Sequence, residues 1–197
     1  MKFLKEREAG YAVDGIGFPS IKGCIAMAYQ TKDGIFGFHN AGNSAPDKFD
    51  GRAKIWSDFI RAHPNGASPG VCLYGVTFAR SNDRGYNQPV VDSWKAELKT
   101  FAARLGFTGP IFGCDLTFSF TGPGKKPSAY VEFKGEGGGY SIFAREWYDD
   151  ARDGVVKADY AASADFRNLD STTMTKMVSD VGKAGLIRVY PERLGGN

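Results

Sequence analysis

Short runs of hydrophobic residues, separated by turns rich in glycine, proline, asparagine and aspartate, dominate the chain. Runs of this kind that are rich in β-branched and aromatic residues are typical of strands, and we assign them to residues 24–29, 34–39, 71–79, 110–120, 128–134, 140–148, 155–160 and 186–190. Hydrophobic residues follow the helical spacing instead in residues 51–63, 89–105 and 172–183, which predicts helices there. Because strands outnumber helices and are grouped, the sequence predicts an α+β fold, a mainly antiparallel β-sheet or sandwich flanked by two or three helices.

The length of the chain, 197 residues, fits one domain with a sizeable core. We see no internal repeat and no linker, so we expect a single domain over residues 1–197. The glycine clusters at 121–124 and 135–139 separate strands. Neither cluster is followed by the start of a helix, as a phosphate-binding loop would require.

Charge and composition exclude several classes of function. The formal net charge is only +3 and the basic residues are scattered, so we expect no nucleic-acid binding. No run approaches the roughly 20 apolar residues that span a bilayer, and residues 1–8 are too charged for a secretory signal. Two histidines and scattered carboxylates give no metal-ligand spacing, so we expect neither a metal nor a cofactor.

One predicted hairpin brings together two reactive residues. Cys24 begins the run 24–29, His39 ends the run 34–39, and Asp33-Gly34 between them is a strong hairpin signal. Opposed residues in such a hairpin have Cβ atoms about 4.5 to 5.5 Å apart. An imidazole at that distance lowers the pKa of a thiol from its ordinary value of about 8.5. The hairpin therefore predicts a thiolate–imidazolium dyad, and its alternative is a buried structural cysteine beside an ordinary histidine.

The remaining cysteines and histidine offer no competing site. Cys72 and Cys114 lie in strand-like runs and are expected to be buried. His63 ends a predicted helix before Pro64 and is expected to be a solvent-exposed residue that is favourable to the helix dipole. Two further groups are weaker candidates: Arg80, Ser81 and Asn82 as substrate contacts, and Asp149, Asp150 and Asp153 as a solvated loop that could bind a cation.

Residues 21–42 resemble the catalytic segment of the cytotoxic necrotizing factor deamidases and, more distantly, the chemotaxis receptor deamidase CheD. In those families a cysteine preceded by Gly or Ser starts a strand, a turn follows, and a histidine ends the next strand. Cys24 and His39 are fifteen positions apart, which is similar to the necrotizing-factor spacing. Lys22 departs from the family's small residue at that position. Ser20 is out of register with the hydroxyl residue that CheD-like enzymes place upstream of the cysteine.

The resemblance implies a protein glutamine deamidase that acts as a bacterial toxin or secreted effector. Cys24 would be the nucleophile and His39 the acid and base, with a backbone carbonyl or a hydroxyl orienting the imidazole. Substrate-binding or oxyanion groups would come from Gly23, Ser20 and Asn40. The large receptor-binding and translocation regions of the necrotizing toxins are absent, which fits a short injected effector or a domain cut from a longer toxin.

The partners that the resemblance implies are proteins. The substrate would be a host protein, with small GTPases as candidates, and a secretion chaperone or an immunity protein could accompany the chain. It would be secreted without a conventional signal peptide and act in the cytoplasm of a target cell, or else stay in the cytoplasm of its own cell.

Three alternatives remain open. An amine in place of water would make the same site a transglutaminase. A papain-like cysteine peptidase or amidase would pair its cysteine with a histidine far downstream, for which only His63 is available. A non-enzymatic β-rich module could present Trp94, Trp147 and Tyr148 to a glycan or a partner protein, although these residues equally suit a core.

Overall fold

Two β-sheets and two α-helices form the part of the chain that the computed structural model describes, which is residues 1–41, 48–78, 90–120, 128–147, 167–168 and 185–197. The five-stranded sheet has the strand order β1 (Lys2–Phe3), β3 (Gly15–Ile21), β8 (Ser128–Glu136), β9 (Gly139–Trp147) and β11 (Ile187–Val189). The seven-stranded sheet has the order β10 (Arg167–Asn168), β2 (Glu8–Ala12), β5 (Ile35–Asn40), β4 (Ile25–Thr31), β6 (Gly70–Thr77), β7 (Ile111–Asp115) and β12 (Glu192–Gly195).

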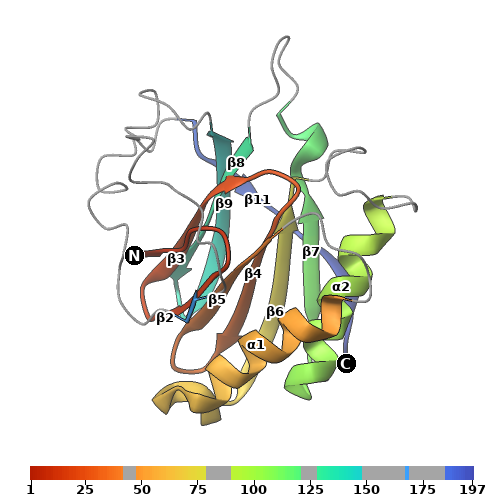
Figure 1. Ribbon diagram of the computed structural model, residues 1–197. Coiled ribbons are helices and arrows are strands. Elements are labelled where there is room, and N and C mark those ends of the chain that lie inside the picture. Colours follow the sequence, from red (N-terminus) through yellow and green to blue (C-terminus); the bar gives the residue numbers. More distant parts are fainter. Residues whose placement is uncertain (42–47, 79–89, 121–127, 148–166, 169–184) are drawn as a thin grey trace.

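Both helices cover the same face of the seven-stranded sheet (Figure 1). They are α1 (Phe49–Ala62) and α2 (Val90–Leu105). A short 3₁₀ turn, η2 (Pro64–Ala67), follows α1, and another, η3 (Leu116–Phe118), follows strand β7. Side chains of β4 alternate between two cores, as the pleat of a strand requires. Ala26 and Ala28 belong to the core between the two sheets, whereas Ile25 and Met27 belong to the core under the helices.

The predicted fold class is confirmed: the described residues form an α+β fold whose sheets are flanked by helices. Seven of the ten strand pairings among these residues are antiparallel. The predicted helices 51–63 and 89–105 correspond to α1 and α2. Neither of these helices is long and apolar enough to cross a membrane.

The strand predictions need one correction and miss several strands. The strand expected over 110–120 ends at Asp115, because the Asp115 carboxylate accepts a hydrogen bond from the Thr117 N–H and so begins η3. Strand β3 was not predicted, since Gly15, Gly17 and Pro19 give its sequence the appearance of a turn. Strands β1, β2, β10 and β12 were not predicted either. The strand expected at 155–160 and the helix expected at 172–183 lie outside the described residues.

Candidate active site

The hairpin that the sequence predicts is formed by β4 and β5. Its turn is closed by a hydrogen bond of 2.8 Å from the Thr31 N–H to the Gly34 carbonyl. In the resulting register His39 lies opposite Ala26, and Cys24 precedes Ala26 by two positions. Cys24 and His39 therefore face the same side of the sheet as diagonal neighbours on adjacent strands, with Cα atoms about 7 to 8 Å apart, and not as a directly opposed pair. In this structure His39 Nε2 makes no hydrogen bond to the thiol, so proton transfer between the two side chains requires local movement.

His39 is fully buried between the two sheets, and its ring has one fixed partner. The Nδ1 atom lies 2.9 Å from the carbonyl oxygen of Leu4. Because a carbonyl oxygen only accepts hydrogen bonds, Nδ1 carries the proton and Nε2 presents a lone pair. The Nε2 atom has no hydrogen-bond partner among the described residues. The ring of Phe18 packs edge-on against the imidazole, with the centroids 6.1 Å apart.

Burial determines the charge state of this imidazole. It lowers the pKa of His39 to about 4, and the hydrogen bond to the Leu4 carbonyl opposes this effect only in part. His39 is therefore neutral at physiological pH and its Nε2 atom is available to accept a proton. The burial favours a neutral thiol and imidazole at rest over the thiolate–imidazolium pair that the sequence predicts.

Cys24 lies immediately before β4 and is held there by the end of β6. Its side chain belongs to the core between the sheets and the residue is only 4% exposed. The Thr77 hydroxyl donates a hydrogen bond of 2.8 Å to the Cys24 carbonyl. The preceding Gly23 has a φ of +67° and donates its N–H to the Phe78 carbonyl at 3.1 Å. A left-handed φ is costly for other residues, which explains the glycine before the candidate nucleophile.

The other predicted site residues are close to the pair in the sequence, but their contacts differ from those that the resemblance implies. The Gly23 N–H is already bonded to Phe78, so in this structure it does not point an open donor at the thiol. Asn40 lies opposite Ile25, on the helix-covered face of the sheet, and its amide donates to Glu97. Ser20 has a φ of +60° at an irregularity of β3. The predicted contacts Arg80, Ser81 and Asn82 lie outside the described residues.

The expectation that Cys72 and Cys114 are buried is wrong. Both lie in strands, as predicted, but both are half-buried, whereas Cys24 is buried. Burial, together with the nearby carboxylates of Asp115 and Glu192, raises the pKa of Cys114 to about 11. This thiol is therefore a poor nucleophile at neutral pH.

His63 follows the end of α1 as predicted, but it is half-buried and not exposed. Its Nδ1 atom accepts a hydrogen bond of 3.1 Å from the Asn65 N–H. Its ring packs on Tyr11 and Phe36, with centroid distances of 4.5 and 5.2 Å, and these residues belong to the core under the helices. Because Cys24 faces the other side of the same sheet, the structure does not bring His63 to Cys24 as a papain-like site would require.

Two residues that hold the pair in place carried no signal in the sequence. Leu4 contributes a backbone carbonyl, which any residue type supplies, so no motif marks it. Thr77 ends a strand like many other threonines, and only the pairing of Thr77 with Ile25 brings it to Cys24. No cluster of three or more His, Cys, Asp or Glu residues suitable for a metal occurs among the residues that the structure describes.

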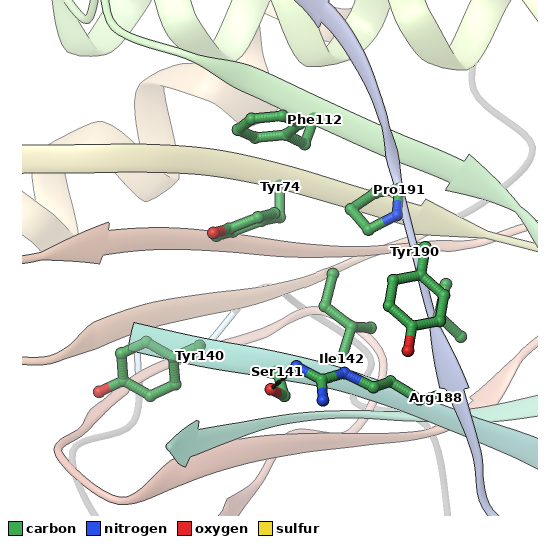
Figure 2. Close-up of a pocket in the computed structure, with 9 residues that line it drawn as sticks. Tyr74, Phe112, Tyr140, Ser141, Ile142, Arg188, Tyr190 and Pro191 are labelled. Atoms are coloured by element: carbon green, nitrogen blue, oxygen red, sulfur yellow. Dashed lines mark hydrogen bonds between the residues drawn. The ribbon is translucent and has the colours of Figure 1, made fainter. Parts of the chain in front are cut away.

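A separate pocket of about 230 Å³ opens between the two sheets (Figure 2), and Cys24 is not among the residues that line it. Tyr74, which lines this pocket, is paired with Ala28 of β4. Ala28 is four positions after Cys24 in the chain. Arg188 is the charged residue of the lining; it donates to the Ser141 hydroxyl at 2.8 Å and lies 5.6 Å from the centroid of Tyr190. Of the three candidates that the sequence offered for such a surface, Trp94 and Trp147 are instead almost fully buried, and Tyr148 lies outside the described residues.

Comparison of the chain with protein-family models found no matching family, and comparison with curated proteins found no match. The assignment of function therefore depends on the geometry of Cys24 and His39 and on the resemblance of residues 21–42.

Proposed function

We propose that the protein is a cysteine-dependent deamidase of protein glutamine residues, with Cys24 as nucleophile and His39 as acid and base. The observation that supports this most directly is the hydrogen bond between His39 Nδ1 and the Leu4 carbonyl. It leaves the Nε2 lone pair as a base on the sheet face that Cys24 occupies. A backbone carbonyl is also one of the two kinds of orienting group that the resemblance to the necrotizing factors implies.

In the first half of the reaction the Cys24 sulfur attacks the carboxamide carbon of a glutamine side chain. His39 Nε2 takes the thiol proton as the carbon–sulfur bond forms. The tetrahedral intermediate then collapses, the carbon–nitrogen bond breaks, and the proton passes from Nε2 to the departing ammonia. The product of this half is a thioester between Cys24 and the substrate.

In the second half His39 Nε2 takes a proton from water, and the hydroxide attacks the thioester carbon. The carbon–sulfur bond breaks and the proton returns from Nε2 to the thiolate of Cys24, which leaves a glutamate on the substrate. The Leu4 carbonyl stabilises the imidazolium that forms transiently in each half, because Nδ1–H donates to it throughout. An amine in place of water gives transglutamination by the same steps.

Access to the thiol is an additional requirement of this chemistry. Cys24 is 4% exposed and His39 is fully buried, yet the sulfur must contact the carboxamide carbon. Binding of the glutamine side chain therefore includes local movement around Cys24. The second half of the reaction requires water at the same place, so this movement also admits a water molecule to His39 Nε2.

The proposed biological setting is that of a toxin or secreted effector that modifies a host protein, with small GTPases as candidate substrates. The test is mass spectrometry of candidate proteins incubated with the chain, because deamidation converts one glutamine to glutamate at an identifiable position. Wild-type protein should modify the target, whereas Cys24→Ala and His39→Ala should not. Cys72→Ala is the matched control, since this cysteine is half-buried and lies elsewhere in the sheet. Full activity of Cys24→Ala would refute the proposal.

The aromatic pocket supports a second candidate, the non-enzymatic binding module. Its lining combines Tyr74, Phe112, Tyr140 and Tyr190 with one guanidinium, a combination that suits a glycan or a peptide side chain. A glycan array and a peptide library, screened with wild-type protein and with Tyr74→Ala, would test this candidate. Binding that depends on Tyr74, together with absence of deamidation, would favour it over the enzyme.

A further inference from the structure

A buried polar cluster lies directly behind His39, on the other face of the same strand. Because successive side chains of a strand point to opposite faces, Asn40 points toward the helices while His39 points between the sheets. The Asn40 Nδ2 atom donates to Glu97 Oε1 at 2.7 Å. Arg52 Nε donates to the same oxygen at 3.1 Å, and a second guanidinium nitrogen of Arg52 also pairs with it.

The three residues come from three different elements and are removed from water. Asn40 ends β5, Arg52 lies in α1 and Glu97 lies in α2. Asn40 and Glu97 are fully buried and Arg52 is 5% exposed. A buried ion pair of this kind contributes little net stability, because both charges lose their hydration. Its best-attested use in proteins is to fix the register of the elements that it joins.

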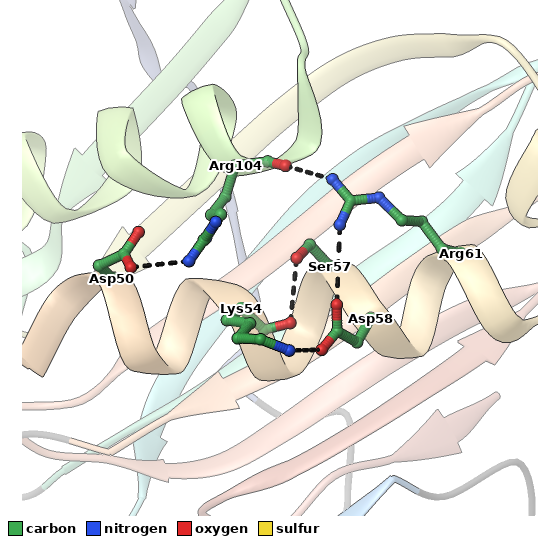
Figure 3. Close-up of polar contacts among 6 residues, drawn as sticks. All are labelled: Asp50, Lys54, Ser57, Asp58, Arg61 and Arg104. Carbon is green, nitrogen blue, oxygen red and sulfur yellow. Dashed lines mark hydrogen bonds and ion pairs between the residues drawn. The ribbon is translucent and has the colours of Figure 1, made fainter.

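Contacts on the surface hold the two helices in the register that the cluster needs (Figure 3). The Arg104 guanidinium donates to Asp50 at 2.8 Å, and Arg61 donates to the Arg104 carbonyl at 2.6 Å. These contacts are exposed and individually weak. They join α1 to α2, the helices that carry Arg52 and Glu97, so the helix pair supports the cluster against which Asn40 is held.

The backbone of His39 is held from the opposite side by the N-terminal segment. Its carbonyl accepts a hydrogen bond of 2.8 Å from the Arg7 N–H, while its ring bonds to the Leu4 carbonyl. We infer that Asn40, Glu97 and Arg52 form a positioning clamp that keeps the end of β5, and with it the His39 ring, aligned with the Leu4 carbonyl and Cys24. This inference depends on the proposed function, since it assigns the clamp to the same Cys24–His39 site.

The clamp acts through His39 and touches neither substrate nor thiol in this account. Displacement of a catalytic group by about 1 Å can reduce rates by about 100-fold. Removal of the Asn40 hydrogen bond should therefore lower the reactivity of Cys24 and weaken the bond to Leu4, even in protein that remains folded. A cluster that only stabilises the fold would change the melting temperature and leave His39 unaffected.

The test uses two readouts that need no identified substrate. The first is the rate at which iodoacetamide alkylates Cys24 at neutral pH, measured by peptide mass spectrometry. The second is the Nδ1–H signal of His39 in nitrogen-15 NMR spectra, which reports the hydrogen bond to Leu4. The variants are Asn40→Leu, which removes the donor at similar size, and His39→Gln, which sets the rate without the imidazole. Ile60→Val removes one buried methylene group from the same helix layer and controls for general destabilisation.

Folded Asn40→Leu should alkylate Cys24 about 10- to 100-fold more slowly than wild type and should lose or shift the Nδ1–H signal, whereas Ile60→Val should do neither. An unchanged rate and signal in folded Asn40→Leu would overturn the clamp. A wild-type rate in His39→Gln would instead show that the proposed dyad is wrong, so the two failures are distinguishable.

A second set of variants, which exchanges the Asn40 amide and the Glu97 carboxylate, keeps the inference testable if Asn40→Leu does not fold. Asn40→Asp alone places a second carboxylate against Glu97 and should disturb the Nδ1–H signal. Combination with Glu97→Gln restores one carboxylate and one amide at the same positions, and should recover the signal and the alkylation rate. Failure of the double variant to improve on Asn40→Asp would count against the clamp.

Discussion

The imidazole of His39 is oriented by the backbone carbonyl of Leu4, 35 residues earlier in the chain, at a distance of 2.9 Å. Leu4 is itself tied to the other sheet, because its N–H donates to the Gly17 carbonyl of β3 at 2.9 Å. The two sheets therefore meet at the candidate base. A substitution at Leu4 leaves this carbonyl in place, so the orientation of His39 depends on the path of the N-terminal segment and not on one side chain.

The first prediction concerns the stability of the protein in acid. The unfolded chain binds a proton at His39 near the ordinary pKa of 6.5, whereas burial lowers the pKa in the folded protein to about 4. The unfolded state therefore takes up more protons between these values, and the folded protein loses stability as the pH falls through this interval. The total loss from this group is about 3 kcal/mol.

Urea denaturation at pH values from 7.5 down to about 4 measures this effect as a fall in the free energy of unfolding. His39→Gln is the control, because other groups titrate equally in both proteins and cancel in the difference. A difference between wild type and His39→Gln that does not change with pH would show that His39 is not buried as the structure describes.

The second prediction concerns the proposed reaction itself. Removal of the imidazole in His39→Ala should lower kcat for deamidation by about 100- to 10,000-fold, the range typical for loss of a general acid–base group. Because the imidazole is neutral down to a pH of about 4, kcat/KM of the wild-type protein should show no acid-side decrease attributable to His39 near pH 6.5. Steady-state assays over pH 4.5 to 9, with ammonia release as the readout, check both statements; a decrease centred near pH 6.5 that His39→Ala abolishes would contradict the second.

The third prediction concerns Thr77. Its hydroxyl donates to the Cys24 carbonyl in a fully buried position, so Thr77→Val leaves that carbonyl without this donor and should destabilise the protein by about 1 to 3 kcal/mol. It should also slow the alkylation of Cys24 in folded protein, because the backbone of the nucleophile loses an anchor. Thr100→Val is the matched control, since the Thr100 hydroxyl bonds to the Ala96 carbonyl on an exposed helix face. Equal effects of the two variants on Cys24 would argue against a role for Thr77 at the site.

Local sequence patterns were sufficient for the elements that are specified locally. The spacing of hydrophobic residues predicted α1 and α2, and Asp33-Gly34 predicted the hairpin of β4 and β5. The alternation of these two strands also placed Cys24 and His39 on one sheet face. Their diagonal offset was not predicted, because it depends on which residues the turn contains, and a shift of the turn moves every pair.

The groups that complete the site could not be predicted from the sequence, because tertiary packing brings them there. Leu4 and Glu97 are 35 and 57 positions away from the residues that they hold, His39 and Asn40. Leu4 acts through its backbone carbonyl. Glu97 acts through its carboxylate, and in the sequence it looks like any glutamate on a helix surface. The charge state of His39 was misjudged for the same reason, since its burial depends on a second sheet whose strand β3 reads as a series of turns.

The last prediction compares two glycines with the same backbone conformation. Gly23, before Cys24, has a φ of +67°, and Gly106, after α2, has a φ of +68°. An alanine costs about 1 to 2 kcal/mol in this left-handed region. Gly106→Ala, at an exposed position, should lower the free energy of unfolding by about this amount, and Gly23→Ala, at a buried position, by at least as much. A Cβ at Gly106 would meet no atom within 4 Å, which makes this variant a clean measure of the backbone cost. Only Gly23→Ala changes the turn that leads into Cys24, so only this variant should also lower the alkylation rate of Cys24 and the rate of deamidation. Both rates are compared below the melting temperatures of both variants; a Gly23→Ala protein with wild-type rates would show that the turn is needed for the fold alone.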